Sequence, residues 1–248
     1  MSFMDLFSGH AGLYASARPR YPEALFAFIA AQSPAQDRVW DCGTGNGQAA
    51  VALSKHFRQV FATDPSEEQI AHAARAANID YSLQPAEATT LPGRSMDAIC
   101  TAQALHWFRF DAFFAEVSRV AVPGALFAAW GYTWFRVSDD FDGAFRTFVF
   151  DVIAPYWAPQ NKLLWDGYVD VPMPFAPVHV PPFSIEATWT LHQLLAYVNT
   201  WSAARRCMQE RGAEFLHSAE RKLQPLWGPP DETRLVTMPL HVLAGRVL

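Results

Sequence analysis

Three glycines and a preceding aspartate stand at alternate positions early in the chain, where they could form a ligand-binding turn. The segment VWDCGTGNGQAA spans residues 39–50 and places Gly43, Gly45 and Gly47 after Asp41. Glycine lets the backbone come close to a ligand because it has no side chain, and a helix that begins there points N–H groups at the same place. The pattern predicts a turn that binds a bulky, polar molecule.

The spacing of the glycines argues against a dinucleotide as that molecule. In the dinucleotide-binding fingerprint G-x-G-x-x-G, the third glycine counted from Gly43 falls at position 48, which is Gln48 in this chain. The carboxylate of Asp41 would also repel a pyrophosphate and attract an ammonium group. S-adenosylmethionine has an amine and no phosphate, so it fits the pattern better than NAD does.

Polar side chains also follow three later hydrophobic runs that the sequence predicts to be strands. Asp64 ends the second run, at about the 20-residue distance from Asp41 that a ribose-binding acid has in a nucleotide-binding unit. Glu87 lies at the end of the third run, and Gln103 and His106 follow the fourth. Because ligands bind at the carboxyl ends of parallel strands, these side chains are predicted to share one site.

Each of these residues also has a structural interpretation. Asp64 could cap the next helix, although Ser66, with Gln69 three residues later, already fits that role. Glu87 could be a solvated loop acid. His106 could accept a proton near neutral pH, or it could be a packing residue among aromatic neighbours.

The elements that position these residues alternate between strands and helices. Strands are predicted at 38–43, 59–64, 81–88, 95–104 and 125–132. Helices are predicted at 47–57, 66–77 and 110–120. This alternation favours a parallel sheet with right-handed crossovers, and the continuous hydrophobic runs indicate strands covered on both faces.

The pattern changes after residue 134. A helix is predicted around 141–152, a strand at 183–191, two helices within 192–227 and a strand at 235–248. The segment 155–182 is rich in proline and tryptophan, which predicts irregular structure. Such a long loop could be a lid or binding loop, or a plain surface excursion.

Length and composition limit the classes of protein. The chain has 248 residues, of which 51% are hydrophobic, and a net charge of −5, so nucleic acid and membranes are poor candidate partners. The cysteines, Cys42, Cys100 and Cys207, are widely spaced and odd in number, which favours packed thiols in a reducing compartment. No signal peptide and no metal-ligand spacing is visible. We expect a cytoplasmic protein without a metal, acting on a small molecule, with a monomer favoured.

The motifs occur in the order found in class I S-adenosylmethionine-dependent methyltransferases, and the chain resembles that family. VWDCGTGNGQAA resembles the first motif and FATDPS the second, QPAEATTLP the adenine segment, SMDAICTAQALHWF the fourth-strand motif and RVAVPGALFA the turn before the fifth strand. Ala125 stands where a second glycine is common. The resemblance implies an α/β fold, Rossmann-like and doubly wound. It implies a mostly parallel seven-stranded sheet with an antiparallel C-terminal strand and added helices.

The resemblance also implies which residues touch the cofactor S-adenosylmethionine. They are Asp41, Gly43, Gly45, Gly47, Asp64, Pro65, Ala86, Glu87, Gln103, Tyr14 and Arg18. Asp64 would bind the ribose, Ala86 and Glu87 would adjoin the adenine, and Arg18 would suit the methionine carboxylate. Arg18 could equally be an exposed, salt-bridged arginine.

Further segments, YASARPRYP, TWSA and MPLHVLAGR, resemble type 11 methyltransferases related to trans-aconitate methyltransferases. One methyltransferase domain is then expected, with a helical cap over 1–35, a cofactor-binding core over 36–134, substrate-side elements over 135–230 and a closing strand over 231–248.

The implied reaction is in-line methyl transfer to a carboxylate, hydroxyl or amine of a small molecule. A carboxylate needs no base, whereas a hydroxyl or amine does, and His106 is the candidate catalytic residue. An NAD-type dinucleotide-binding oxidoreductase and a methyltransferase-like binding protein without turnover are the alternatives.

Overall fold

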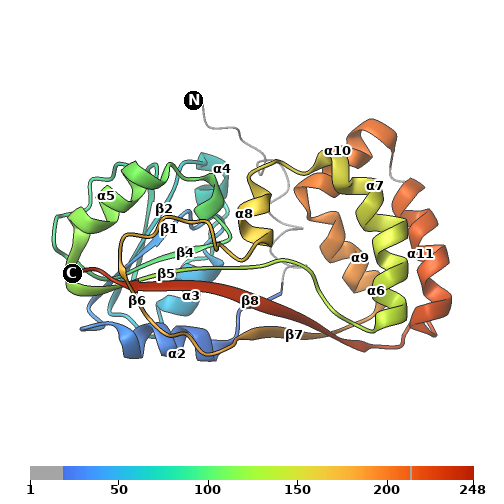
Figure 1. Cartoon of the computed structure of the whole chain (residues 1–248), viewed down its shortest axis with the longest axis horizontal. Coiled ribbons are helices and arrows are strands. Elements are labelled where there is room, and N and C mark those ends of the chain that lie inside the picture. The colour runs from blue at the N-terminus through green and yellow to red at the C-terminus, as the bar shows by residue number, and fades with distance from the viewer. Residues whose placement is uncertain (1–18, 213) are drawn as a thin grey trace.

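The computed structural model describes residues 19–212 and 214–248. Tyr14 and Arg18, which the sequence assigned to the cofactor site, lie outside the described residues. One half of the molecule carries the sheet and the other half is helical, with the short helix α8 (Asn161–Trp165) between them (Figure 1).

Eight strands form a single hydrogen-bonded network, whose parallel strands lie in the first half and whose β7 and β8 extend toward the helical half (Figure 1). The strand order is β3-β2-β1-β4-β5-β8-β6, and β7 pairs with β8 off this path. The strands are β1 (Arg38–Cys42), β2 (Gln59–Asp64), β3 (Ile79–Leu83), β4 (Met96–Ala102), β5 (Ala121–Tyr132), β6 (Ala176–Pro177), β7 (Ser184–Trp189) and β8 (Arg234–Arg246). Strands β1 to β5 are mutually parallel, and β8 runs antiparallel to β5.

This topology confirms the predicted α/β fold with a mostly parallel sheet and an antiparallel C-terminal strand. The strand count differs from the expected seven, because the 13-residue β8 is long enough to pair with β5 through one half and β7 through the other. The two-residue β6 then adds to its edge.

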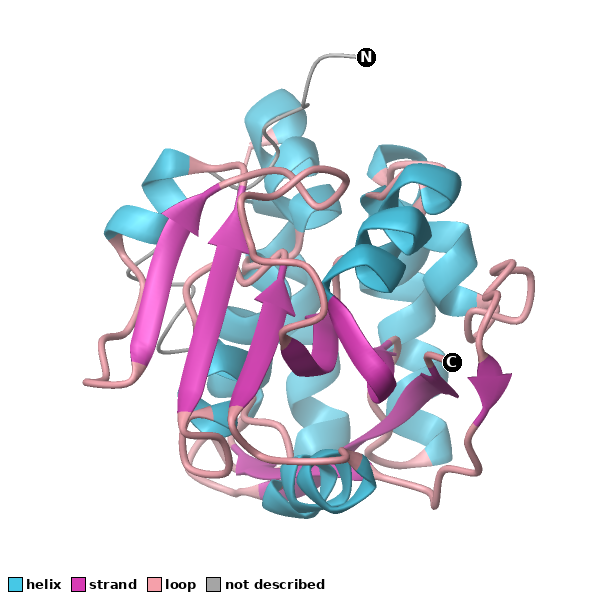
Figure 2. Ribbon diagram, turned by 90° about the vertical axis from the view of Figure 1, so that its left-hand side faces the viewer, coloured by secondary structure: helices cyan, strands magenta, loops and turns pink. Residues whose placement is uncertain are grey.

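Helices cover both faces of the parallel strands, as Figure 2 shows. One face packs against α2 (Glu23–Gln32) and α3 (Gln48–Leu53), and the other against α5 (Phe110–Val120). Neighbouring residues of β1 therefore belong to different cores: Val39 packs with the first group and Trp40 with the second. Burial on both faces explains why the strands are continuous hydrophobic runs.

Two predicted helices end earlier in the structure. Helix α3 stops at Leu53, and α4 (Glu67–Ala71) stops well before residue 77. After α4, the backbone N–H of Ala74 donates to the carbonyl of Asn46 at 3.0 Å instead of to its own helix. The chain beyond α4 is thus fastened to the glycine turn.

The helical half departs from the sequence prediction in two places. Residues 155–182 are not wholly irregular, because α8 forms at Asn161–Trp165, a stretch that contains no proline. Residues 192–227 form three helices instead of two. The helices of this half are α6 (Asp139–Phe145), continued by a π-helical turn Arg146–Phe150, then α7 (Asp151–Ile153), α9 (Leu191–Asn199), α10 (Ser202–Arg211) and α11 (Glu214–Trp227).

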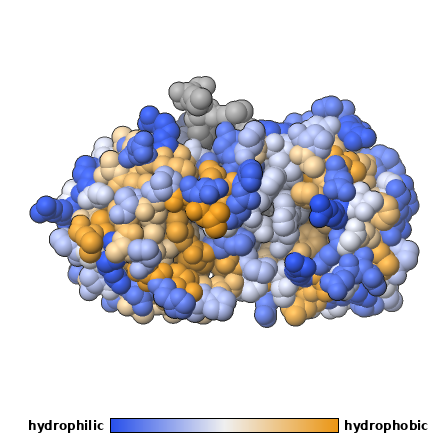
Figure 3. All heavy atoms as spheres, viewed as in Figure 1, coloured by the Kyte–Doolittle hydropathy of each residue, from blue (hydrophilic) through white to orange (hydrophobic). Residues whose placement is uncertain are grey.

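Hydrophobic and hydrophilic residues are interspersed over the face drawn in Figure 3, with hydrophobic ones gathered more on the sheet-bearing half. Within the described residues, none of the helices has the length and apolar composition needed to cross a bilayer. Cys42, Cys100 and Cys207 are buried free thiols, as predicted.

Candidate functional site

The glycine turn connects β1 to α3 in a left-handed backbone conformation. Gly43, Gly45 and Gly47 have φ angles of +67°, +55° and +82°, a region that residues with side chains rarely adopt. The conformation of the turn therefore favours glycine at these three positions, whether or not a ligand binds there.

The surroundings of the three glycines differ. A Cβ atom on Gly43 would lie 2.7 Å from the Cβ of Ala104, and one on Gly47 would overlap the hydroxyl of Tyr81. A Cβ on Gly45 would meet only the side chain of Gln69, at 3.7 Å. The outer glycines thus make room for the protein's own chain, and Gly45 is the one that faces open space.

Asp41 is a carboxylate wholly removed from solvent directly beneath this turn. The hydroxyl of Thr44 donates to its Oδ2 at 2.6 Å, while its Oδ1 has no hydrogen-bond partner among the described residues. Burial raises the pKa of Asp41 from 3.8 to about 7, and the nearby charge of Asp64 adds to the rise. A buried carboxylate oxygen without a donor is costly, and an ammonium group would satisfy it.

Asp64 ends β2 and closes the turn from the other side. Its Oδ2 accepts a hydrogen bond from the backbone N–H of Gly45, and its Oδ1 accepts one from the N–H of Ser66, both at 2.9 Å. Ser66 itself caps α4, since its side chain accepts from the N–H of Gln69. The carboxylate of Asp64 therefore fixes the backbone of the glycine turn and the start of α4 relative to each other.

The segment QPAEATTLP, which the resemblance assigned to the adenine, follows β3. Ala86 is buried, and Pro65, on the neighbouring loop after β2, is partly buried. Glu87 is not a solvated loop acid, because its Oε1 accepts from the backbone N–H of Arg109 at 3.0 Å, at the start of α5. That bond ties this segment to the loop after β4.

Gln103 and His106 both follow β4, in different environments. Gln103 has a φ of +56°, and its side-chain Nε2 donates to the carbonyl of Tyr132 at 3.0 Å, which fixes the ends of β4 and β5 to each other. His106 lies in a short 3₁₀ helix, Leu105–Trp107, and is 5% exposed.

The imidazole of His106 is buried beside an aromatic side chain. Its ring lies 5.0 Å from that of Trp107, and its Nδ1 has no hydrogen-bond partner among the described residues. Burial lowers the pKa of His106 to about 4. The ring is therefore neutral at physiological pH and is a weak proton acceptor.

The structure thus brings together most residues that the sequence predicted, at one edge of the sheet. Asp41, Gly45 and Asp64 are linked by hydrogen bonds or charge, and Gly43 adjoins the loop that carries Gln103 and His106 through Ala104. Within the described residues, no group of three His, Cys, Asp or Glu side chains could hold a metal ion.

Sequence reasoning missed Tyr81 and Tyr168. Tyr81 lies on β3 against Gly47, and its hydroxyl donates to the carbonyl of Ala74 at 2.6 Å. Tyr168 lies against Gly131 of β5. Neither position carries a local signal, because both contacts join segments that are distant in sequence.

The turn also holds the beginning of the described chain. The side-chain Nε2 of Gln48, the residue that breaks the dinucleotide fingerprint, donates to the carbonyl of Pro19 at 2.7 Å. Pro19 is therefore held beside the first turn of α3.

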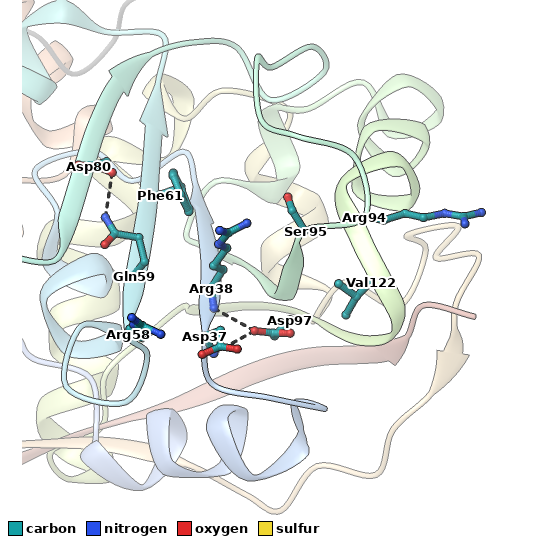
Figure 4. Close-up of a pocket in the computed structure, with 10 residues that line it drawn as sticks. All are labelled: Asp37, Arg38, Arg58, Gln59, Phe61, Asp80, Arg94, Ser95, Asp97 and Val122. Atoms are coloured by element: carbon teal, nitrogen blue, oxygen red, sulfur yellow. Dashed lines mark hydrogen bonds between the residues drawn. The ribbon is translucent and has the colours of Figure 1, made fainter.

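A groove of about 580 Å³ lies at the opposite edge of the sheet (Figure 4). It is lined by the first residues of the parallel strands, among them Arg38, Gln59 and Asp97. Asp97 accepts from the backbone N–H groups of Asp37 and Arg38, at 3.0 and 2.9 Å, so its carboxylate fastens the chain before β1. No residue that the sequence assigned to the site lines this groove.

The family that this chain matches, and the relatives described below, are methyltransferases by name. The chain matches the Methyltransf_11 family, described as a methyltransferase domain, over residues 40–129. A Dictyostelium discoideum protein named as a methyltransferase is 31% identical over 251 residues, covering 98% of this chain and 95% of the relative. A solved structure from Anaeromyxobacter dehalogenans, named as a type II methyltransferase, is 40% identical with a TM-score of 0.87, covering 93% of this chain and 98% of that one.

A partial relative has a name that states its acceptor. The fatty-acid O-methyltransferase of Mycolicibacterium smegmatis is 32% identical over 115 residues, which cover 44% of this chain and 42% of the relative.

The dinucleotide alternative loses its support, because the matched family and the relatives that span nearly the whole chain are methyltransferases. The turn agrees with that assignment, since the unpaired oxygen of Asp41 suits an amine and the open surroundings of Gly45 suit a closely approaching ligand. The chain belongs to the class I S-adenosylmethionine-dependent methyltransferases, and S-adenosylmethionine is its methyl donor.

Proposed function

We propose that this methyltransferase transfers the methyl group to a carboxylate oxygen of a small acid. The observation that carries the proposal is the environment of His106, the residue nearest the reacting edge that could act as a base. It is buried, and burial lowers its pKa to about 4. A hydroxyl or amine acceptor needs a base with a pKa near the working pH, whereas a carboxylate is already ionised.

The proposed donor site consists of the residues that the sequence pointed to and the structure describes. Asp41 would bind the ammonium group through its free oxygen, Asp64 the ribose hydroxyls, and Ala86 with Pro65 the adenine. The backbone of Gly43, Gly45 and Gly47 would lie against the methionine and ribose. Gln103 would adjoin the methyl group, and Glu87 would support the adenine segment through its bond to Arg109.

Methyl transfer to a carboxylate requires the protein mainly to align the acceptor with the methyl group of the donor. The bound cofactor supplies a sulfonium, which is a good leaving group. The residues around it have to hold the acceptor carboxylate in line and exclude water, and such orientation contributes roughly 7–11 kcal/mol. No proton moves, so a neutral His106 is compatible with turnover and would contact or pack beside the acceptor.

Two resemblances support an acid as the acceptor. The first is the interpretation of YASARPRYP, TWSA and MPLHVLAGR as segments that resemble type 11 methyltransferases related to trans-aconitate methyltransferases, a name that none of the proteins compared above bears. The second is the Mycolicibacterium relative, which aligns with 44% of this chain and is named for a fatty-acid substrate. We assign the donor site to the core 36–134 and the acceptor side to 135–230, with residues 1–35 as a cap and 231–248 as the closing strand.

A screen of matched acceptors tests the proposal. Each carboxylic acid is assayed beside the alcohol and the amine with the same carbon skeleton, and turnover is measured as release of S-adenosylhomocysteine. We expect acids to be methylated and their alcohols and amines to react at least tenfold more slowly. Preferential methylation of alcohols or amines would contradict the carboxylate proposal and would require a base other than a neutral, buried imidazole.

A further inference from the structure

Two strained residues from distant segments converge on Gly131 of β5. Among the described residues, the non-glycine positions with left-handed φ angles are Arg94, Gln103 and Tyr168, the last two at +56° and +62°. A Cβ atom on Gly131 would lie 3.0 Å from the Oε1 of Gln103 and 3.3 Å from the hydroxyl of Tyr168. Strained backbone persists where the surrounding structure enforces it, and it is concentrated at functional sites.

The hydroxyl of Tyr168 is buried and has nothing to bind. Tyr168 is 1% exposed, and its Oη has no hydrogen-bond partner among the described residues. Burial raises the pKa of Tyr168, so the group remains an O–H donor at neutral pH. An unsatisfied buried hydroxyl is unfavourable unless a ligand or water completes it.

This hydroxyl lies at the edge where the donor binds. Gly43 of the glycine turn abuts Ala104, and Ala104 follows Gln103, whose side-chain oxygen lies beside Gly131, as the hydroxyl of Tyr168 does. In the sheet, β4 lies between β1 and β5, so the glycine turn after β1 and the residues beside Gly131 of β5 are separated by one strand. Tyr168 is therefore placed on the acceptor side of the reacting edge.

An apolar wall adjoins the same segment. Trp134 follows β5, and its ring centroid lies 5.5 Å from that of Trp165 and 6.1 Å from that of Trp157. All three tryptophans are half-buried, and the indole Nε1 of Trp157 is buried without a partner. Trp165 ends α8, three residues before Tyr168. Partly exposed indoles of this kind suit the carbon skeleton of a ligand.

We propose that Tyr168 binds the acceptor by donating a hydrogen bond to its carboxylate, while Trp134, Trp157 and Trp165 bind an apolar carbon skeleton. The substrate class is an acid with a hydrophobic body, and Tyr168 is a specificity-determining residue. This inference rests on the proposed carboxylate methylation, and it adds the group that recognises the acid and the surface that selects its body.

The test measures acid binding separately from turnover. Decanoate, phenylacetate and acetate are titrated into the protein saturated with S-adenosylhomocysteine, with tryptophan fluorescence as the signal. Phenylacetamide, which has no charge, is the ligand control. Decanoate and phenylacetate should bind at least tenfold more tightly than acetate, which lacks the apolar body, and phenylacetamide should bind more weakly than phenylacetate.

The decisive variant is Tyr168→Phe, which removes only the hydroxyl. Loss of a hydrogen bond to a charged group should weaken binding of decanoate and phenylacetate by roughly ten- to a hundredfold. The melting temperature should not fall, because the hydroxyl has no partner in the protein, and the affinity for S-adenosylhomocysteine should stay unchanged. Thr101→Val is the matched control, since Thr101 in β4 also has a buried hydroxyl without a partner.

Three results would overturn the inference: wild-type protein that binds none of the acids, a Tyr168→Phe variant with wild-type affinity for them, or equal effects of Tyr168→Phe and Thr101→Val. Turnover is scored independently. Acids that bind through Tyr168 without forming S-adenosylhomocysteine would refute the proposed carboxylate methylation and leave the acid-binding site standing.

Discussion

At the scale of single residues, the proposed contact between the buried Asp41 and the cofactor would couple cofactor binding to the stability of the protein. Burial raises its pKa from 3.8 to about 7, so the folded protein keeps a proton that the unfolded chain releases between these pH values. Stability without cofactor should therefore fall as pH rises through that window, by up to roughly 1.4 kcal/mol per pH unit. An ammonium ligand reverses the penalty because it pairs with the charged form.

The Asp41→Asn variant separates these two effects. It should flatten the fall in unfolding free energy between about pH 4 and 7, and stabilise the cofactor-free protein at pH 8, because the neutral amide carries no buried charge. It should also weaken binding of S-adenosylhomocysteine at least tenfold. Urea unfolding across pH and calorimetric titration measure both quantities. Parallel pH profiles for wild type and variant would show that Asp41 is not the titrating group.

Asp64 has a matched neighbour in Ser66. Asp64→Ala removes hydrogen bonds from a charged group, each worth roughly 1.5–3 kcal/mol, so affinity for S-adenosylhomocysteine should fall at least tenfold. Ser66→Ala removes the cap of α4 and should cost about 1 kcal/mol of stability with little loss of affinity. Equal affinities of the two variants for S-adenosylhomocysteine would show that Asp64 has only a structural role in the glycine turn.

His106 distinguishes the acceptor classes. Loss of a general base lowers turnover by roughly 10²–10⁴, whereas a carboxylate acceptor needs none. We therefore expect His106→Asn to change kcat for an acid by less than about tenfold, with its main effect on the acceptor KM. Steady-state kinetics at saturating donor check this. A fall of kcat into the general-base range would identify His106 as the catalytic base.

At the scale of elements, the conformation of the glycine turn depends on packing against neighbouring segments of the chain. Gly47→Ala should lower the free energy of unfolding more than Gly45→Ala, since both positions are left-handed but only Gly47 is crowded, by Tyr81 of β3. Urea denaturation of the two variants compares them directly. Equal losses would mean that the contact with Tyr81 gives way without cost.

The elements most predictable from sequence were those whose pattern of buried hydrophobic residues can be seen within a few consecutive positions. Strand β1 was predicted because Val39 and Trp40 are buried on opposite faces, which gives a continuous hydrophobic run. The predicted length of α4 was wrong, because the helix ends at Ala71 and the chain beyond it bonds to the glycine turn through Ala74 and Asn46. The position of Tyr168 could not be predicted, because it depends on packing against Gly131, in a strand separated from it by the intervening helices.

At the scale of the whole molecule, the sequence motifs that predict function lie in one half of the protein. The family match at 40–129 lies within the half that holds the glycine turn, and its motifs were visible in the sequence as a series. The helical half joins it through β5, α8 and β8, and its helices lie outside the matched residues. The acceptor therefore has to be inferred from Tyr168 and the tryptophans, and not from a motif.

The fate of a labelled methyl group tests the central claim most directly. The protein is incubated with an acid and S-adenosylmethionine labelled in its methyl group, and the product is treated with mild base. Methylation of a carboxylate gives an ester, so the label should be released as methanol at a yield that matches the S-adenosylhomocysteine formed. Label that stays on the acceptor after base treatment would be an ether or an N-methyl group and would contradict carboxylate methylation.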